Sequence, residues 1–111
     1  MSAAEPAVGA PAEPAAALEV RHNPEARRFE AWVGGEMCRA DYREVDGAMR
    51  IFHTEVPYHV SGQGLAGRVV AAALDYARAN NLRVVPACSY VHAYMRRHPE
   101  TQDLLLPRMT L

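Results

Sequence analysis

A strand, a short glycine-rich loop and a long helix follow one another without a break between residues 52 and 80. The loop, SGQGLAG over residues 61–67, leaves backbone N–H groups unpaired at the positively polarised start of the helix. Phosphate and pyrophosphate groups bind at helix starts of this kind. Gly62, Gly64 and Gly67 permit the close backbone approach and the positive φ angles that a phosphate cradle needs. The segment therefore predicts a binding site for a phosphorylated cofactor.

The letters of the loop narrow the kind of cofactor. A Walker loop ends in Gly-Lys-Ser or Gly-Lys-Thr, whereas this chain contains no lysine and all 12 basic side chains are arginine. Residues 62–67 do match the dinucleotide fingerprint G-x-G-x-x-G. However, the strand–loop–helix unit stands alone in the second half of a short chain, which is the wrong place for half of a Rossmann fold. On spacing alone, a chance glycine turn stays open as the alternative.

The first half of the chain has the alternating pattern of an antiparallel sheet. We expect strands over residues 18–22, 29–33, 37–45 and 48–56, separated by turns at residues 23–25, 34–35 and 46–47. Phe29 and Trp32 point to opposite faces of the second strand, so one of them is exposed or covered by a helix. In the fourth strand, Met49, Ile51 and His53 are expected to share one face.

The second half combines helical periodicity with one buried strand. An apolar stripe marks the buried face of the first helix: Val70, Ala73, Leu74 and Ala77. The pair Asn80-Asn81 ends this helix, and residues 82–85 indicate a strand that is buried beside a parallel neighbour. A second helix is expected from about residue 90 to residue 98, where Pro99 stops it. The order β-β-β-β-α-β-α predicts an α+β fold, a curved mixed sheet with the cofactor helix on one face.

Composition places this fold in one small domain. The chain has 111 residues and a net charge of -1, which favours neither a nucleic-acid-binding protein nor a membrane-surface protein. Residues 1–17 are mostly Ala, Pro, Glu and Gly without the pattern of a signal peptide, so we interpret them as a disordered leader before a domain over residues 18–111. No run approaches the ~18 apolar residues of a membrane span. We interpret Cys38 and Cys88 as thiols of a cytoplasmic protein that is a monomer or a weak homodimer.

Four separated blocks give the chain a more specific resemblance. They read HTEVP from His53, GQG from Gly62, VPACSYV from Val85 and YMRRHPE from Tyr94. In this order they resemble the GCN5-related N-acetyltransferase superfamily, and most of all its small, single-domain branch, sometimes called YjdJ-type. The resemblance covers roughly residues 18–106. In the superfamily the loop usually opens with Arg or Gln, whereas this chain has Ser61, which can donate a hydrogen bond but carries no charge.

This resemblance implies an enzyme that moves the acetyl group of acetyl-CoA to an amine. The strand before the loop and the strand after the helix would start parallel and then splay apart, with the pantetheine arm hydrogen-bonded to the backbone of Glu55 and Val56. The residues expected to bind acetyl-CoA are Val56, Ser61, Gly62, Gln63, Gly64, Leu65, Ala66, Gly67 and Arg68. Larger members carry extra helices between their first strands, so the acceptor side is expected to be open in this chain. The sequence leaves the acceptor as a small amine, a protein lysine or a protein N-terminus.

Four residues are candidates for the chemistry, because acetyl transfer needs a proton acceptor for the amine and a proton donor for the leaving thiolate. Tyr94 stands where the superfamily often has its tyrosine acid. Cys88 lies just before the second helix, where a thiol is partly ionised, and it resembles a cysteine of the small branch that acts as base or acyl-carrying nucleophile. His53 and Glu55 share a strand face and can relay a proton. A packed tyrosine, an inert thiol and a structural polar contact stay open as alternatives.

Other functions leave weaker signals. Cys88 and His92 are four residues apart, as helical metal ligands are, but no second close ligand pair accompanies them, so we expect no metal. The alternative to an enzyme is an acyl-CoA-binding module with little catalysis that acts through a protein partner. A small structural domain without a cofactor is the third possibility, and it requires the four-block resemblance to be accidental.

Overall fold

The structure is a computed structural model that describes residues 19–107. Its elements follow in the order β1 (Arg21–Asn23), β2 (Arg28–Val33), β3 (Glu36–Val45), β4 (Ala48–Glu55), η2 (Tyr58–Val60), α1 (Leu65–Ala79), β5 (Arg83–Pro86), α2 (Ser89–Arg97) and η3 (Pro99–Leu104). The strands form one sheet in the order β1-β2-β3-β4-β5, in which neighbours pair antiparallel except for the parallel pair β4–β5. This arrangement confirms the predicted α+β fold. The predicted leader over residues 1–17 lies outside the described residues.

Two tight turns join the central strands. Gly34 and Gly35 connect β2 to β3, and Asp46 and Gly47 connect β3 to β4. Their φ angles are 56°, 81°, 51° and 77° respectively. Two positive φ angles in succession are what a two-residue type I′ hairpin turn requires. The two predicted hairpin turns are therefore confirmed.

The first strand begins later than predicted and includes a residue that was expected in the turn. Asn23 is the last residue of β1 and pairs with Arg28 across the ladder. Its side chain both accepts and donates a hydrogen bond. Oδ1 accepts a hydrogen bond from the N–H of Ala26 (3.1 Å), and Nδ2 donates one to Glu30 (2.9 Å). An asparagine that closes a turn through its own side chain can thus serve as strand end and turn start together.

A bulge in β4 corrects the predicted facing of its second half. Tyr42 pairs with Ile51 and Asp41 pairs with His53, so Phe52 has no residue opposite it on β3. One extra residue reverses the alternation beyond it. Met49 and Ile51 are buried as predicted, but His53 lies on the exposed face. The prediction that these three residues share one face is wrong for His53 because of this bulge.

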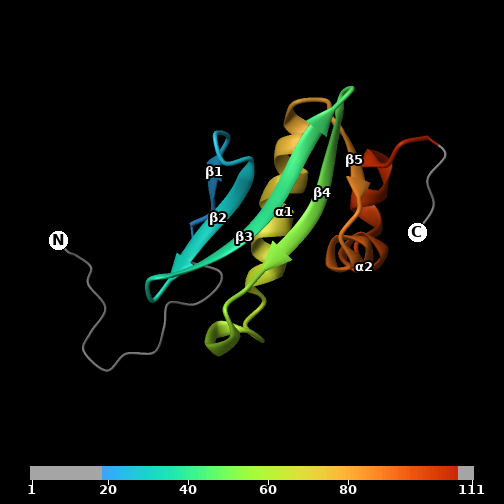
Figure 1. The fold of residues 1–111 in the computed structure, drawn as a ribbon. Helices are drawn as coiled ribbons and strands as arrows, with labels where there is room; N and C mark the ends of the chain where they lie inside the picture. Colours follow the sequence, from blue (N-terminus) through green and yellow to red (C-terminus); the bar gives the residue numbers. More distant parts are fainter. Residues whose placement is uncertain (1–18, 108–111) are drawn as a thin grey trace.

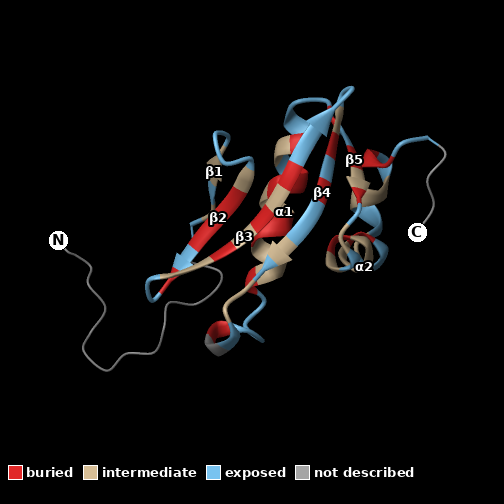
Figure 2. Ribbon diagram, in the orientation of Figure 1, coloured by how far each residue is buried: buried red, intermediate tan, exposed pale blue. Residues whose placement is uncertain are grey.

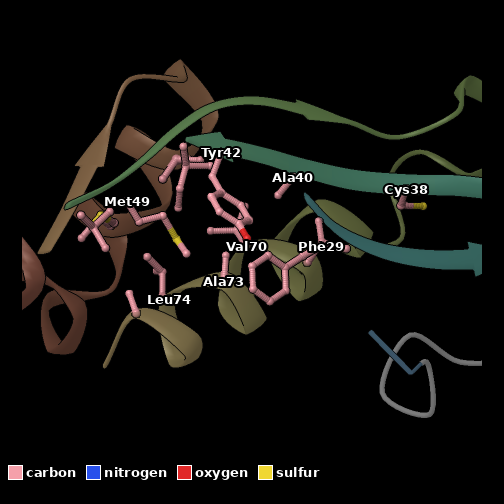
Figure 3. Close-up of a cluster of buried hydrophobic side chains, with 14 of the residues drawn as sticks. Phe29, Cys38, Ala40, Tyr42, Met49, Val70, Ala73 and Leu74 are labelled. Carbon is pink, nitrogen blue, oxygen red and sulfur yellow. The ribbon is translucent and has the colours of Figure 1, made fainter. Parts of the chain in front are cut away.

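The core lies between the sheet and α1. Figure 1 shows α1 behind β3 and β4, and Figure 2 shows the buried positions along these strands and on the helix. The stripe predicted for α1 is buried: Val70, Ala73, Leu74 and Ala77. It packs in one cluster with Phe29, Tyr42 and Met49 of the sheet (Figure 3). Trp32 is 52% exposed on the opposite side of β2 from Phe29, as the alternation predicts.

We call the sheet face away from α1 the outer face. In the view of Figure 1, no described helix lies in front of β3 and β4 on this face. α2 packs beside β4 and β5. η3 follows α2 closely in the sequence, and both contribute residues to the same core cluster. η3 was not predicted, because the sequence marked Pro99 only as the end of a helix. None of the helices in residues 19–107 is both long enough and apolar enough to cross a membrane.

Candidate functional site

β4 and β5 separate at one carbonyl group. They pair from Ala48 to Ile51 on β4, and the carbonyl of Ile51 then accepts hydrogen bonds from the N–H groups of Ala87 and Cys88 (3.0 Å each). β5 ends there, whereas β4 continues to Glu55, and no described strand pairs with this last part of β4 on the β5 side. The parallel pair therefore splays apart as predicted. The backbone of β4 beyond Ile51 borders the resulting gap.

The loop after β4 leads into an open, uncapped helix start. α1 begins at Leu65 with Gly64 as its N-cap, no side chain caps it, and no acidic residue lies in its first turn. Gly62 and Gly64 have φ angles of 83° and 76°, and a Cβ built on either residue would meet no atom within 4 Å. The positive end of α1 and its unpaired N–H groups therefore border open space. This geometry suits an anionic group such as a phosphate.

Two predicted loop residues are already engaged within the protein. The hydroxyl of Ser61 donates a hydrogen bond to the carbonyl of Tyr58 (2.7 Å), so it stabilises η2 and has to rotate before it can serve a ligand. Leu65 is buried in the core, so only its backbone borders the loop. Gln63 is exposed, while Ala66 and Arg68 are half-buried in the first turn of α1.

Gly67 corrects a further expectation. It lies inside α1 and does not adopt the predicted positive φ angle. A Cβ on Gly67 would lie 3.4 Å from Tyr90 Oη and 3.6 Å from Tyr94 Cε2. The glycine therefore serves the close approach of two tyrosines from α2 to the first turn of α1. Tyr90 was not singled out from the sequence, although its spacing of four residues from Tyr94 places both on one helix face.

Tyr94 is held firmly by its neighbours. Its ring stacks on that of His98, with centroids 3.9 Å apart and planes 15° from parallel. His98 Nδ1 also lies 2.7 Å from the carbonyl oxygen of Tyr94. Burial, followed by the negative charge of Glu100, raises the pKa of Tyr94. Its hydroxyl is therefore protonated at neutral pH, which is the state that a proton donor needs.

Cys88 occupies the N-cap position of α2, next to the gap. Its sulfur lies 3.7 Å from Thr54 Oγ1. Thr54 reaches it because the bulge turns this residue, opposite Ala40, toward the core side of the sheet. Burial alone would raise the pKa of the Cys88 thiol, but the N–H of Val91, the hydroxyl of Thr54 and the N–H of Tyr90 stabilise the thiolate and lower the pKa overall. Cys88 thus lies at the start of α2 as predicted, and its pKa is shifted in the direction that favours the thiolate.

His53 and Glu55 share one face of β4, as the sequence predicted of this pair, and that face is the outer one. His53 Nε2 is 3.1 Å from Glu55 Oε1. Arg39 Nη2 is also 3.1 Å from that oxygen, and Arg39 Nε is 3.1 Å from Asp41 Oδ2. The hydrogen bond from His53, followed by the charge of Arg39, lowers the pKa of Glu55. When Nε2–H of His53 donates to Glu55, Nδ1 carries the lone pair that can accept a proton.

The candidate groups lie on both sides of β4. Cys88 and Thr54 are on the core side, whereas His53 and Glu55 are on the outer face. The thiol and the imidazole therefore lie on opposite sides of this strand. Within residues 19–107, no three His, Cys, Asp or Glu side chains come together as a metal site would require.

Residues 28–104 match the family model described as GCN5-related N-acetyl-transferase. The chain belongs to the GCN5-related N-acetyltransferase family. Similar proteins include Protein NATD1 from Xenopus tropicalis, which is 30% identical over 95 residues, covering 83% of this chain and 87% of the relative. Protein NATD1 from Mus musculus is 33% identical over 90 residues, with coverages of 78% and 82%.

A solved structure supports the same assignment. A GCN5-like protein from Staphylococcus aureus, determined by NMR in solution, superimposes with a TM-score of 0.65 at 27% sequence identity, covering 80% of this chain and 88% of that chain. The family and the fold inferred from the four sequence blocks are thereby confirmed. The GCN5-related chain is thus an acetyltransferase-like domain whose splayed strands, open loop and thiol lie at one end of β4.

Proposed function

We propose that this chain binds acetyl-CoA and transfers the acetyl group to an amine. The observation that carries the proposal is the meeting of three features at one end of β4. These are the uncapped start of α1, the gap between β4 and β5, and the thiol of Cys88 beside that gap. They offer places for the phosphates, the pantetheine arm and the thioester of one extended molecule.

The binding roles follow the order of these features along the chain. We assign the pyrophosphate to the backbone of the loop and the first turn of α1: Ser61, Gly62, Gln63, Gly64, Leu65, Ala66, Gly67 and Arg68. The pantetheine arm would pair with the open backbone of Glu55 and Val56, where β4 has lost its β5 neighbour. Because Ser61 adds no charge, binding to this loop relies on N–H groups and the helix dipole.

The proposed reaction needs a base on the acceptor and an acid for CoA. The amine nitrogen attacks the thioester carbonyl, the C–S bond breaks, and the CoA thiolate leaves. His53, held by Glu55, takes the proton that the amine loses, and Tyr94 or Tyr90 gives a proton to the thiolate. In a second route the Cys88 thiolate attacks first, CoA leaves, and the amine then attacks the acetyl group on Cys88 and releases the thiolate.

The test begins with calorimetric titration of the full chain with acetyl-CoA and with CoA. We expect saturable binding that Gly64→Glu weakens tenfold or more, because the carboxylate would enter the open space of the loop and repel phosphate. Gly47→Glu is the matched control: Gly47 has nearly the same φ angle (77° against 76°) and equally open space, but lies in the β3–β4 turn. Absence of binding at millimolar acetyl-CoA would sink the proposal.

Turnover separates an enzyme from the alternative binding module. Protein that binds acetyl-CoA is incubated with primary amines, and acetylated product and free CoA are measured together. Binding without acetylated amine would favour a module that acts through a protein partner. An acetyl group found on Cys88 by mass spectrometry after exposure to acetyl-CoA alone, and absent from Cys88→Ala, would select the covalent route.

A further inference from the structure

A pocket of ≈ 240 Å³ opens on the outer face, where the turn before β2 meets β3 and the bulge of β4. The charged residues of its lining and the exposed aromatic residue Phe52 come from separate segments: Arg27, Arg28, Arg39, Asp41, Arg43 and Phe52. Four of the twelve arginines of the chain therefore border one concavity. Like charges gathered in this way favour an anion among them.

Only part of this positive charge is balanced within the protein. Arg28 pairs with Glu30 (2.6 Å), and Arg39 is shared between Asp41 and Glu55 as described above. Among the carboxylates of residues 19–107, none forms an ion pair with Arg27 or Arg43. Two guanidinium groups at the pocket are thus available to an external carboxylate or phosphate, which a guanidinium can bind through paired N–H groups.

Contacts within the protein position the side chain of Arg43 and the backbone of Arg27. The Arg43 guanidinium lies 5.7 Å from the centroid of the Phe52 ring, within cation–π range. Arg27 has a φ angle of 56°. Its N–H donates to the Pro24 carbonyl (3.1 Å), and its carbonyl accepts the N–H of Tyr42 (3.0 Å). The backbone at Arg27 is therefore anchored on both sides of the residue, which fixes the point where its side chain leaves the turn.

The pocket lies next to the proposed reaction centre. Phe52 directly follows Ile51, whose carbonyl marks the point where β5 leaves β4. Arg39 lines the pocket and also contacts Glu55, the partner of His53. His53 lies opposite Asp41, and Arg43 is two residues further along β3, so the backbone at Arg43 lies about 5 Å across and roughly 7 Å along the strands from the backbone at His53. A ligand that bridges the two positions is short.

We propose that this pocket binds the anionic group of the acceptor, so that the amine which is acetylated carries a phosphate or a carboxylate a few bonds from its nitrogen. The proposal rests on the transferase function proposed above and names its acceptor class. Polyamines fit poorly, because every additional group on them is cationic and would face Arg27 and Arg43.

The experiment compares amines that differ only in the anionic group. Initial rates with saturating acetyl-CoA are measured for O-phosphoethanolamine against ethanolamine, and for β-alanine against its amide. We expect kcat/KM to be about tenfold or more higher for the anionic member of at least one pair, since charge-assisted hydrogen bonds contribute at that level. The two pairs also show whether phosphate or carboxylate is preferred.

Variants connect that preference to the pocket. Arg43→Gln, and Arg27→Asn, which keeps a residue that tolerates a positive φ angle, are expected to bring the anionic-to-neutral ratio toward one. Arg50→Gln is the control, because Arg50 lies opposite Arg43 on the same face but outside the pocket lining; it should keep the ratio. Equal rates within both pairs would overturn the inference and leave the transferase proposal standing. Acetylation of no amine at all would instead sink the transferase proposal, and this inference with it.

Discussion

Cys38 and Cys88 carry the same thiol in two different surroundings. Cys38 is fully buried on β3, where burial, followed by the charge of Glu36, raises its pKa. At Cys88 the helix start and Thr54 overcome the effect of burial and lower the pKa. Reactivity at neutral pH therefore depends on the position of the thiol in the fold. The proposed covalent route is available to Cys88 alone of the two.

We expect iodoacetamide to alkylate Cys88 at pH 7 while Cys38 stays unmodified in the native protein, as peptide mass spectrometry can show. Thr54→Val removes a hydrogen bond to the thiolate, so the pH midpoint of Cys88 alkylation should move upward. Thr54→Ser keeps the hydroxyl and should restore the original midpoint. An identical midpoint in Thr54→Val would contradict a role of Thr54 in lowering the pKa.

The same thiol links reactivity to stability. Its folded pKa lies below the ordinary value of 9.0, so the thiolate contributes stability above about pH 9, and this contribution is lost as the pH falls through the folded pKa.

The position of Thr54 could not be predicted from the sequence. Strict alternation assigned His53 to the core face and Thr54 to the outer face, and one unpaired residue at Phe52 exchanged them. Nothing in the local letters announces this bulge, because it arises from pairing with β3.

At the scale of elements, α1 was predictable because its apolar stripe and the Asn80-Asn81 end are strong local signals. Its first residue was harder to place. The sequence Leu65-Ala66-Gly67 suits a loop as well as a helix, and a glycine at residue 67 by itself favours a loop. In the structure Gly67 lies inside α1, where it packs against Tyr90 and Tyr94.

Two glycines three residues apart should therefore respond in opposite ways to alanine. Gly64 has a φ angle of 76°, so Gly64→Ala should cost about 1–2 kcal/mol of unfolding free energy. Gly67 is helical, and a Cβ there would make ordinary contacts at 3.4 and 3.6 Å. Gly67→Ala should then stabilise the protein by about 0.5–1 kcal/mol. Urea unfolding of both variants measures these values. Destabilisation by Gly67→Ala would show that α2 packs too closely for a methyl group.

At the scale of the whole molecule, the helices gather on one face of the sheet and leave the other open (Figure 1). The open sheet face was expected, because the sequence has no room for extra helices between the first strands. The arginine pocket on that face was not expected. Arg27, Arg43 and Phe52 are far apart in the sequence and meet only through the pairing of β3 with its neighbours. A site assembled by sheet register has no local signature, whereas the glycine loop is contiguous and was found from its letters.

The C-terminal segment ties the two helices to each other. Arg78 of α1 grips both carboxylate oxygens of Asp103 (2.8 and 2.9 Å) and also donates to the carbonyl of Glu100 (3.0 Å). From the other side, Gln102 Nε2 donates to the carbonyl of Met95 on α2 (3.0 Å). η3 is thus a bridge between α1, the helix that would bind phosphate, and α2, the helix that begins directly after Cys88.

Removing the Arg78 contacts of η3 should change amide hydrogen exchange in η3 and leave the β2–β3 hairpin unaffected. We expect Arg78→Gln to speed amide hydrogen exchange across residues 99–105 by roughly two- to fivefold, since the lost pair is exposed, while the β2–β3 hairpin keeps its protection. Arg96→Gln is the control, because Arg96 is exposed on α2 and makes no ion pair with the described residues.

The hydrogen bond and charge of Arg78 hold the pKa of Asp103 below its ordinary value of 3.8. The carboxylate therefore stabilises the bridge above pH 3.8, and its contribution disappears as the pH falls through the lowered pKa. In Asp103→Asn, amide exchange over residues 99–105 should lack that acid transition. Unchanged amide exchange in both Arg78→Gln and Asp103→Asn would mean that apolar packing alone holds η3.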